Sequence, residues 1–299
     1  MISVAECVSC NAPENFSTII RPFQLFVEAI VVIVLIGIVA ASIAVYVKQP
    51  VESYALTVRR LTLTEQADIA LRQISRDLAA AVPNSARFDL SGTTLEFLHL
   101  RGGARYCNGN GLDCGAALFG GTTSVALIGP WVGSTPILGD YLVFGNGMGV
   151  SCDAWAATPS NRRTISAVTT TSGLVTGFSY VGTPFANTCT ETVSRIMVSD
   201  GPVAFVCDPV NQVIWRYAGY AIQASMPTSI AAYDNLIAAT GSKARVASLV
   251  QCAASAGGSG TVFSADQLLD GLIELRIQLK SSDSESVNLY RQVKVDNTL

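Results

Sequence analysis

One carboxylate, Glu28, stands near the start of an apolar run that covers residues 23–47 and contains no other charge. The run exceeds the roughly 20 apolar residues that cross a bilayer as a helix. An ionised acid within hydrocarbon costs on the order of 2.5–3.5 kcal/mol, so it is expected to have a function and a partner. The pattern predicts a subunit that resides in a membrane before it is packed into a polymer, with Glu28 as an assembly contact.

Cysteines are the second group of reactive side chains. Six follow the apolar run: Cys107, Cys114, Cys152, Cys189, Cys207 and Cys252. None of the six forms a C-x-x-C metal pair, which indicates disulfides in an oxidising compartment. An Asn-Gly turn between the first two favours a local Cys107–Cys114 loop. Sequential pairing of the other four is our prediction, and buried free thiols are the alternative.

Catalytic chemistry has little support in the sequence. The only histidine, His99, lies on a predicted strand at 94–100 and has no motif around it. A Ser-His-Asp or Cys-His site would need it as the base. G-x-S-x-G, H-E-x-x-H and P-loop motifs are missing, and the acidic residues lack EF-hand spacing. We therefore predict no enzyme activity, cofactor or metal, with a calcium site of loop oxygens as the alternative.

The tryptophans offer a further candidate for binding. Trp131, Trp155 and Trp215 could together form a binding surface. Large aromatic side chains also dominate protein cores, and we favour this core role for the three.

The elements that carry these residues begin with a helix in two halves. We expect a leader at 1–22, a transmembrane helix at 23–49, an amphipathic helix at 50–85 and a β-rich head at 86–299. Pro50 is expected to bend the helix, because it removes one hydrogen bond. The amphipathic face is predicted from apolar residues three, four or seven apart: Leu56, Leu63, Ala67, Ala70, Ile74, Leu78 and Ala81.

Alternating polar and apolar residues predict an antiparallel sheet after residue 88. The expected strands are 94–100, 140–144, 163–168, 174–180, 195–198, 203–207, 212–217, 245–251, 272–279 and 287–295. The last two should pair as a hairpin. Segments 110–134, 221–243 and 253–260 are interpreted as loops or short helices. The predicted fold class is α+β, with a long bent helix packed on a disulfide-bonded antiparallel sheet.

Composition and charge limit the remaining classes of protein and of partner. Charged residues make up 14% and hydrophobic ones 49% of the chain, which excludes a disordered protein. We find no basic stripe with interleaved aromatics, so nucleic acid is not an expected partner.

The orientation in the membrane is predicted from charges and cysteines. Lys48, Arg59 and Arg60 follow the apolar run, whereas Arg21 precedes it, and this distribution favours a cytoplasmic head. The six cysteines favour a periplasmic head, and we give them more weight.

The N-terminal pattern resembles that of type IV pilins and pseudopilins. It consists of Glu28, the apolar run with Gly-Ile-Val-Ala-Ala at 37–41, a proline, an amphipathic helix and a cysteine-bearing β domain. The segment QPVESYALTVRRLTLTEQADIALRQISRDLAAAVPNSARF is similar to minor pilins of mannose-sensitive haemagglutinin (MSHA)-type pili, the MshO-like branch. DGPVAFVCDP, VIWRYAGY and SVNLYRQVKVDN resemble the same branch, so the resemblance covers nearly the whole chain after residue 22.

The resemblance implies a pilin-like fold and a structural minor subunit of a type IV pilus, in assembly initiation, tip formation or adhesion. Glu28 would neutralise the N-terminal amine of a neighbouring subunit. The implied partners are major and minor pilins, the inner-membrane assembly platform and a prepilin peptidase that cleaves and methylates. The implied location is the bacterial inner membrane, with a periplasmic head, and then the pilus at the cell surface.

One departure from the family concerns processing. The family is cleaved after a glycine, whereas this chain has Pro22, Phe23 and Gln24 at the junction. Poor cleavage, a divergent peptidase and an uncleaved anchor are all compatible with this sequence. The alternatives to a pilin are a type II secretion pseudopilin and a membrane-anchored binding or adhesive protein that does not polymerise. An ordinary secretory signal cleaved near residues 42–44 is a further alternative.

Overall fold

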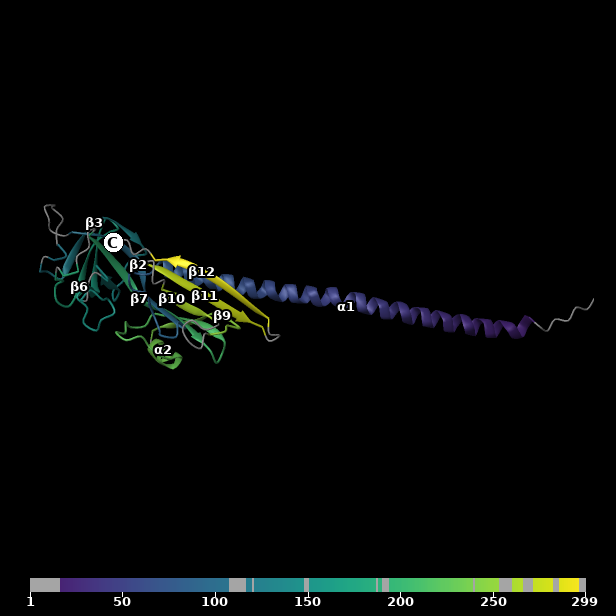
Figure 1. Ribbon diagram of the computed structural model, residues 1–299. Helices are drawn as coiled ribbons and strands as arrows, with labels where there is room; N and C mark the ends of the chain where they lie inside the picture. The colour runs from purple at the N-terminus through teal and green to yellow at the C-terminus, as the bar shows by residue number, and fades with distance from the viewer. Residues whose placement is uncertain are drawn as a thin grey trace, which may run out of the picture. The chain divides into compact units, whose positions relative to one another are not determined.

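The computed structural model describes residues 17–107, 117–119, 121–147, 151–186, 188–189, 194–238, 240–252, 260–265, 271–281 and 285–295. The chain divides into two compact units, Met1–Arg59 and Arg60–Leu299. Helix α1 (Ser17–Ala79) begins in the first unit and ends in the second (Figure 1).

The first unit contains the apolar part of α1. The helix starts at Ser17, inside the predicted leader, and Pro50 does not end it. Every side chain from residue 24 to residue 54 is exposed in the isolated chain. By length and composition, this helix can cross a membrane.

In the second unit, α1 is amphipathic as its sequence predicts. Residues three or four apart turn to one side of a helix, and in α1 these positions are buried. The buried residues are Leu63, Ala67, Ala70, Leu71, Ile74 and Leu78. The helix ends at Ala79, earlier than the predicted residue 85, because the next residues bridge to a strand: the amide of Val82 donates to the carbonyl of Leu98.

The remaining elements are twelve strands and one short helix within the described residues. They are β1 (Arg87–Phe88), β2 (Thr94–Tyr106), β3 (Ser124–Gly133), β4 (Tyr141–Val143), β5 (Arg162–Thr171), β6 (Leu174–Val181), β7 (Arg195–Asp208), β8 (Val213–Ala218), α2 (Ile230–Ile237), β9 (Ser242–Ser248), β10 (Val262–Ala265), β11 (Leu272–Lys280) and β12 (Ser286–Lys294). Nine strands form one sheet in the order β1-β2-β3-β6-β5-β4-β7-β8-β9, and β10-β11-β12 form a second sheet.

Six strands of the larger sheet close into an antiparallel barrel. The ring runs β2-β3-β6-β5-β4-β7 and returns to β2, because β2 pairs with both β3 and β7. Its interior is filled by apolar side chains: Tyr106, Leu118, Val125, Leu142, Phe144, Ile165, Val175, Phe178, Tyr180, Phe185, Ile196 and Val198. Such a small barrel is a packed core rather than a channel.

Two glycines allow β2 and β3 to approach closely at the barrel seam. A Cβ on Gly102 would lie 2.4 Å from the carbonyl oxygen of Val132, and one on Gly133 would lie 2.4 Å from that of Arg101. Real Cβ atoms do not approach backbone this closely, so this register requires glycine at both positions.

The barrel corrects the predicted fold class. An open, pilin-type α+β sheet head is wrong, because the strands of the head close on themselves. The sequence interpretation assigned residues 110–134 to loops or short helices and therefore lacked β3, one of the six barrel strands. Alternation identifies strands, but it does not identify which strands pair.

The second sheet covers a different core. The hairpin β11–β12 forms as predicted, in antiparallel register from Leu272↔Lys294 to Lys280↔Ser286. Its inner face joins the buried side of α1 and the part of the large sheet that extends beyond the barrel. The residues of this sheet in the shared hydrophobic core are Phe263, Ile273, Leu275, Ile277, Leu279 and Val293.

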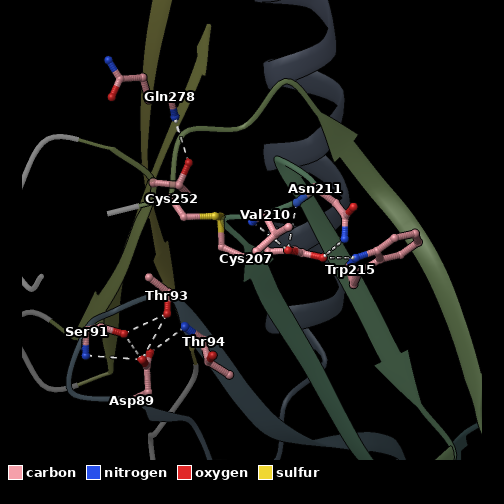
Figure 2. Close-up of a disulfide and its surroundings, with 12 residues drawn as sticks. Asp89, Ser91, Thr93, Thr94, Cys207, Val210, Asn211, Trp215, Cys252 and Gln278 are labelled. Carbon is pink, nitrogen blue, oxygen red and sulfur yellow. Dashed lines mark hydrogen bonds between the residues drawn. A yellow bond between two sulfur atoms is a disulfide. The ribbon is translucent and has the colours of Figure 1, made fainter. Parts of the chain in front are cut away.

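Two disulfides have both cysteines within the described residues, and both follow the sequential order. Cys152–Cys189 lies at the barrel core, with Cα atoms 5.6 Å apart. Cys207–Cys252 joins the end of β7 to the segment after β9, with Cα atoms 5.8 Å apart (Figure 2). Cys107 is disulfide-bonded as well, whereas Cys114 lies outside the described residues.

We expect the double variant Cys207→Ala/Cys252→Ala to lower the free energy of unfolding by about 2–5 kcal/mol, because the cross-link restricts the unfolded chain. Urea denaturation of the full-length protein in lipid nanodiscs, followed by tryptophan fluorescence, measures this change. The loops span 45 and 37 residues, so Cys152→Ala/Cys189→Ala should differ from the first variant by less than about 0.5 kcal/mol. Unchanged stability in both variants would contradict the expectation.

Candidate functional site

The apolar surface of α1 carries one acidic side chain over its membrane-length part. Glu28 is exposed among exposed aliphatic residues, which include Leu25, Val27, Ile30, Val31, Val32, Ile33, Val34 and Leu35. The next charges along the helix are Lys48 and Glu52, which lie 3.8 Å apart as an i,i+4 pair. This surface can pack against lipid or against other apolar helices.

The predicted processing junction lies inside this helix. Pro22 and Phe23 are part of α1, and their side chains lie outside the described residues, whereas the side chain of Gln24 is exposed. Cleavage at this position stays a prediction.

A second polar cluster surrounds the buried carboxylate of Glu96. Arg87 is its cross-strand partner in the β1–β2 pairing, and the two side chains lie 2.7 Å apart. The hydroxyl of Tyr220 donates to Glu96 at 2.6 Å. The Arg87 guanidinium also lies 3.6 Å from the ring centroid of Trp155 and donates to two carbonyls of the 221–224 segment. This cluster joins β1, β2 and the segment after β8.

Burial dominates the acid–base behaviour of this cluster. Desolvation raises the pKa of Glu96, although Arg87 and the hydroxyl of Tyr220 partly offset this effect. Desolvation and the adjacent carboxylate raise the pKa of Tyr220 far above its ordinary value. The sequence analysis missed this cluster, because Arg87 and Glu96 become partners only once the β1–β2 register is known.

A third cluster contains the only histidine. Nδ1 of His99 lies 2.8 Å from the carboxylate of Asp200, which is also 3.6 Å from Arg101. Arg101 in turn lies 2.7 Å from Asp140, whose pKa is raised by desolvation. Within the described residues, no hydroxyl or thiol forms a hydrogen bond with His99. The arrangement is an ion-pair network at the β2–β4–β7 junction, rather than a nucleophile aligned with a base.

The three tryptophans lie in three different clusters. Trp155 is buried and donates to the carbonyl of Ser85. Trp131 packs edge-on against Phe178 at the barrel. Trp215 packs near α2. They do not form one common binding surface.

Two loop carboxylates next to the Cys207–Cys252 disulfide accept hydrogen bonds from neighbouring residues of the chain. Asp89 accepts hydrogen bonds from Ser91, Thr93 and the amide of Thr94, as Figure 2 shows. Asp208 accepts from Asn211 and from other groups, and these bonds hold its pKa low even though desolvation raises it. Among the described residues, no group of three or more His, Cys, Asp or Glu side chains is arranged to hold a metal ion.

Comparison with protein-family models, with curated proteins and with solved structures finds no match for this chain. The chemistry of its surfaces is therefore the basis for assigning a function.

We expect Tyr220→Phe to lower the free energy of unfolding by about 1–3 kcal/mol, because it removes a donor from a buried carboxylate. Tyr290→Phe is a matched control: its hydroxyl also donates to a glutamate at 2.6 Å, but the tyrosine is exposed. For this control we expect the free energy of unfolding to fall by less than about 0.5 kcal/mol. If urea denaturation gave the same loss of stability for Tyr220→Phe and Tyr290→Phe, burial of Glu96 would not be the cause of the destabilisation.

Stability should also depend on pH through Glu96. Its pKa is raised in the folded state, so the folded protein binds the proton more tightly than the unfolded chain does. This contribution is present at low pH and is lost as pH rises through the folded-state pKa. Relative to Glu96→Gln, the wild type should gain stability as pH falls from about 7 to about 4.5. If the denaturation midpoints of the wild type and of Glu96→Gln changed equally with pH over this range, the predicted direction of the pH dependence would be wrong.

Proposed function

We propose that this chain is a structural subunit that first resides in a membrane and then packs its N-terminal helix into a filament, as a minor pilin of a type IV, MSHA-like pilus. The supporting observation is the exposed apolar surface of α1, with Glu28 as its one charge between residues 24 and 47. Soluble monomers rarely expose contiguous apolar patches larger than a few hundred Å². This surface therefore requires lipid or other subunits around it.

Glu28 favours assembly over a purely lipid-facing anchor. A carboxylate in hydrocarbon is unfavourable, and a cation from a neighbouring subunit offsets this cost. A free N-terminal amine of the next subunit is such a cation, and a charge pair in a low-dielectric bundle also defines the register between helices. The partners on this proposal are major and minor pilins and an inner-membrane assembly platform.

The head supports a role outside the cytoplasm. Disulfides persist in oxidising compartments, and two of them stabilise this domain. The barrel departs from a pilin-type sheet, so the proposal depends on the helix and not on a shared head fold. A large distinct head suits a subunit at the pilus tip, in initiation of assembly or in adhesion.

A second candidate is a membrane-anchored periplasmic binding or adhesive protein that does not polymerise. Pro22 is the observation that favours it, because proline replaces the glycine at which prepilin peptidases cleave. In this case α1 stays in the bilayer as a permanent anchor and only the head is functional.

We expect Glu28→Ala to abolish incorporation into sheared surface filaments, because the neighbouring amine loses its partner. Glu52→Ala is the matched control, since Glu52 lies on the same helix, beyond the apolar run. Immunoblots of sheared filaments and of membranes from the native cell measure both variants. Equal incorporation of the two variants would contradict the assembly role of Glu28.

Mass spectrometry of the mature N-terminus separates the two candidates. A methylated N-terminus at Phe23 or Gln24 supports filament assembly. An intact Met1 in all membrane and surface fractions supports the permanent anchor.

A further inference from the structure

A groove outside the barrel is large and mostly apolar. It lies where the end of α1 meets the outer surfaces of β2, β3 and β7, and its volume is about 710 Å³. Leu100, Pro130, Val132 and Met197 contribute apolar walls, and the groove also includes Arg105 and Arg195. Ligand sites in proteins commonly measure roughly 300–1,000 Å³, so the groove has a suitable size for a small ligand.

The two arginines lie directly opposite each other. Arg105 pairs in register with Arg195 across β2 and β7. Their strand neighbours Tyr106 and Ile196 point into the barrel core, and side chains alternate along a strand, so both arginines point outward. Arg105 therefore presents its guanidinium group at the groove, where it can pair with an anion.

Arg105 is available for such an anion. Its side chain is exposed. Arg195 also lines the groove, but it has an interaction of its own, so Arg105 is the residue assigned to the anion. A guanidinium binds a carboxylate with two parallel hydrogen bonds, which gives both charge and geometric selectivity.

The apolar side of the groove specifies the rest of the ligand. Val132 is 70% exposed and Ile128, the cross-strand partner of Arg105, is 36% exposed. Burial of these side chains by a ligand chain would stabilise the complex. Apart from the two arginines, the side chains that line the groove are apolar or glycine.

We propose that this groove binds a fatty acid, with its carboxylate paired with Arg105 and its alkyl chain along Leu100, Val132 and Met197. The charge of Arg105 and the apolar wall together select an anion with an apolar tail. This inference goes beyond the proposed function and does not depend on filament assembly, since the groove belongs entirely to the head.

A photoreactive dodecanoate that carries a diazirine near the end of its chain tests this proposal. The probe is cross-linked to the full-length protein in nanodiscs, and the modified peptides are located by mass spectrometry. We expect adducts in peptides that contain residues 100–105, 128–132 or 195–197. Unlabelled dodecanoate should compete at least tenfold better than dodecanol, because only the acid is charged. Each added methylene between octanoate and dodecanoate should improve competition about fourfold, which corresponds to about 0.8 kcal/mol.

The variants separate the groove from unspecific partition into lipid. We expect Arg105→Gln to reduce groove adducts at least fivefold. Arg245→Gln should leave them unchanged, because Arg245 is an exposed arginine on the edge strand β9. Val132→Ser should weaken competition by dodecanoate more than competition by octanoate, while the folded state is verified by an unchanged denaturation midpoint.

Three results would overturn the proposal. The first is labelling confined to residues 24–47 of α1, which would show partition into the bilayer only. The second is equal groove labelling in wild type and Arg105→Gln. The third is stronger competition by an apolar peptide with a free C-terminal carboxylate than by dodecanoate, which would assign the groove to a peptide. Because assembly is not part of the assay, a failure here leaves the test of Glu28 unaffected.

Discussion

The pairing of β2 with β7 is the constraint on which the head depends. The two strands pair from Thr94↔Val206 to Arg105↔Arg195, with register shifts near His99 and Leu100. One end of the pair belongs to the barrel, where Tyr106 and Ile196 face the interior. The other end belongs to the core that α1 shares with the second sheet, through Leu95 and Phe205 among others. Such shifts bend and twist a strand, so a single pair can serve two cores.

Polar groups gather along this pair and connect the elements around it. Glu96 of β2 connects β1 to the segment after β8 through Arg87 and Tyr220. His99 of β2 and Asp200 of β7 lie at the register shift and connect to β4 through Arg101 and Asp140. Glu96 and Asp140 are buried, and each lies beside an arginine. Because a buried charge is costly unless it is paired, these two pairs favour the strand arrangement that brings the partners together.

The two units of the chain present different surfaces. The first exposes an aliphatic helix with a carboxylate, and its chemistry is that of a membrane or a helical bundle. The second is a disulfide-bonded domain whose outer surface carries an arginine-bearing groove. On the proposed function, the helix holds the subunit in the membrane or filament, and the head is free to recognise a ligand.

The sequence by itself determined the local features of this protein. Apolar length identified the helix, residues three and four apart identified the buried side of its second half, and alternation identified most strands and the β11–β12 hairpin. These properties depend on neighbours along the chain. Barrel closure, the partnership of Arg87 with Glu96 and the opposition of Arg105 to Arg195 were decided by the tertiary structure. Strand pairing joins residues about a hundred positions apart, and periodicity carries no information about which strands become partners.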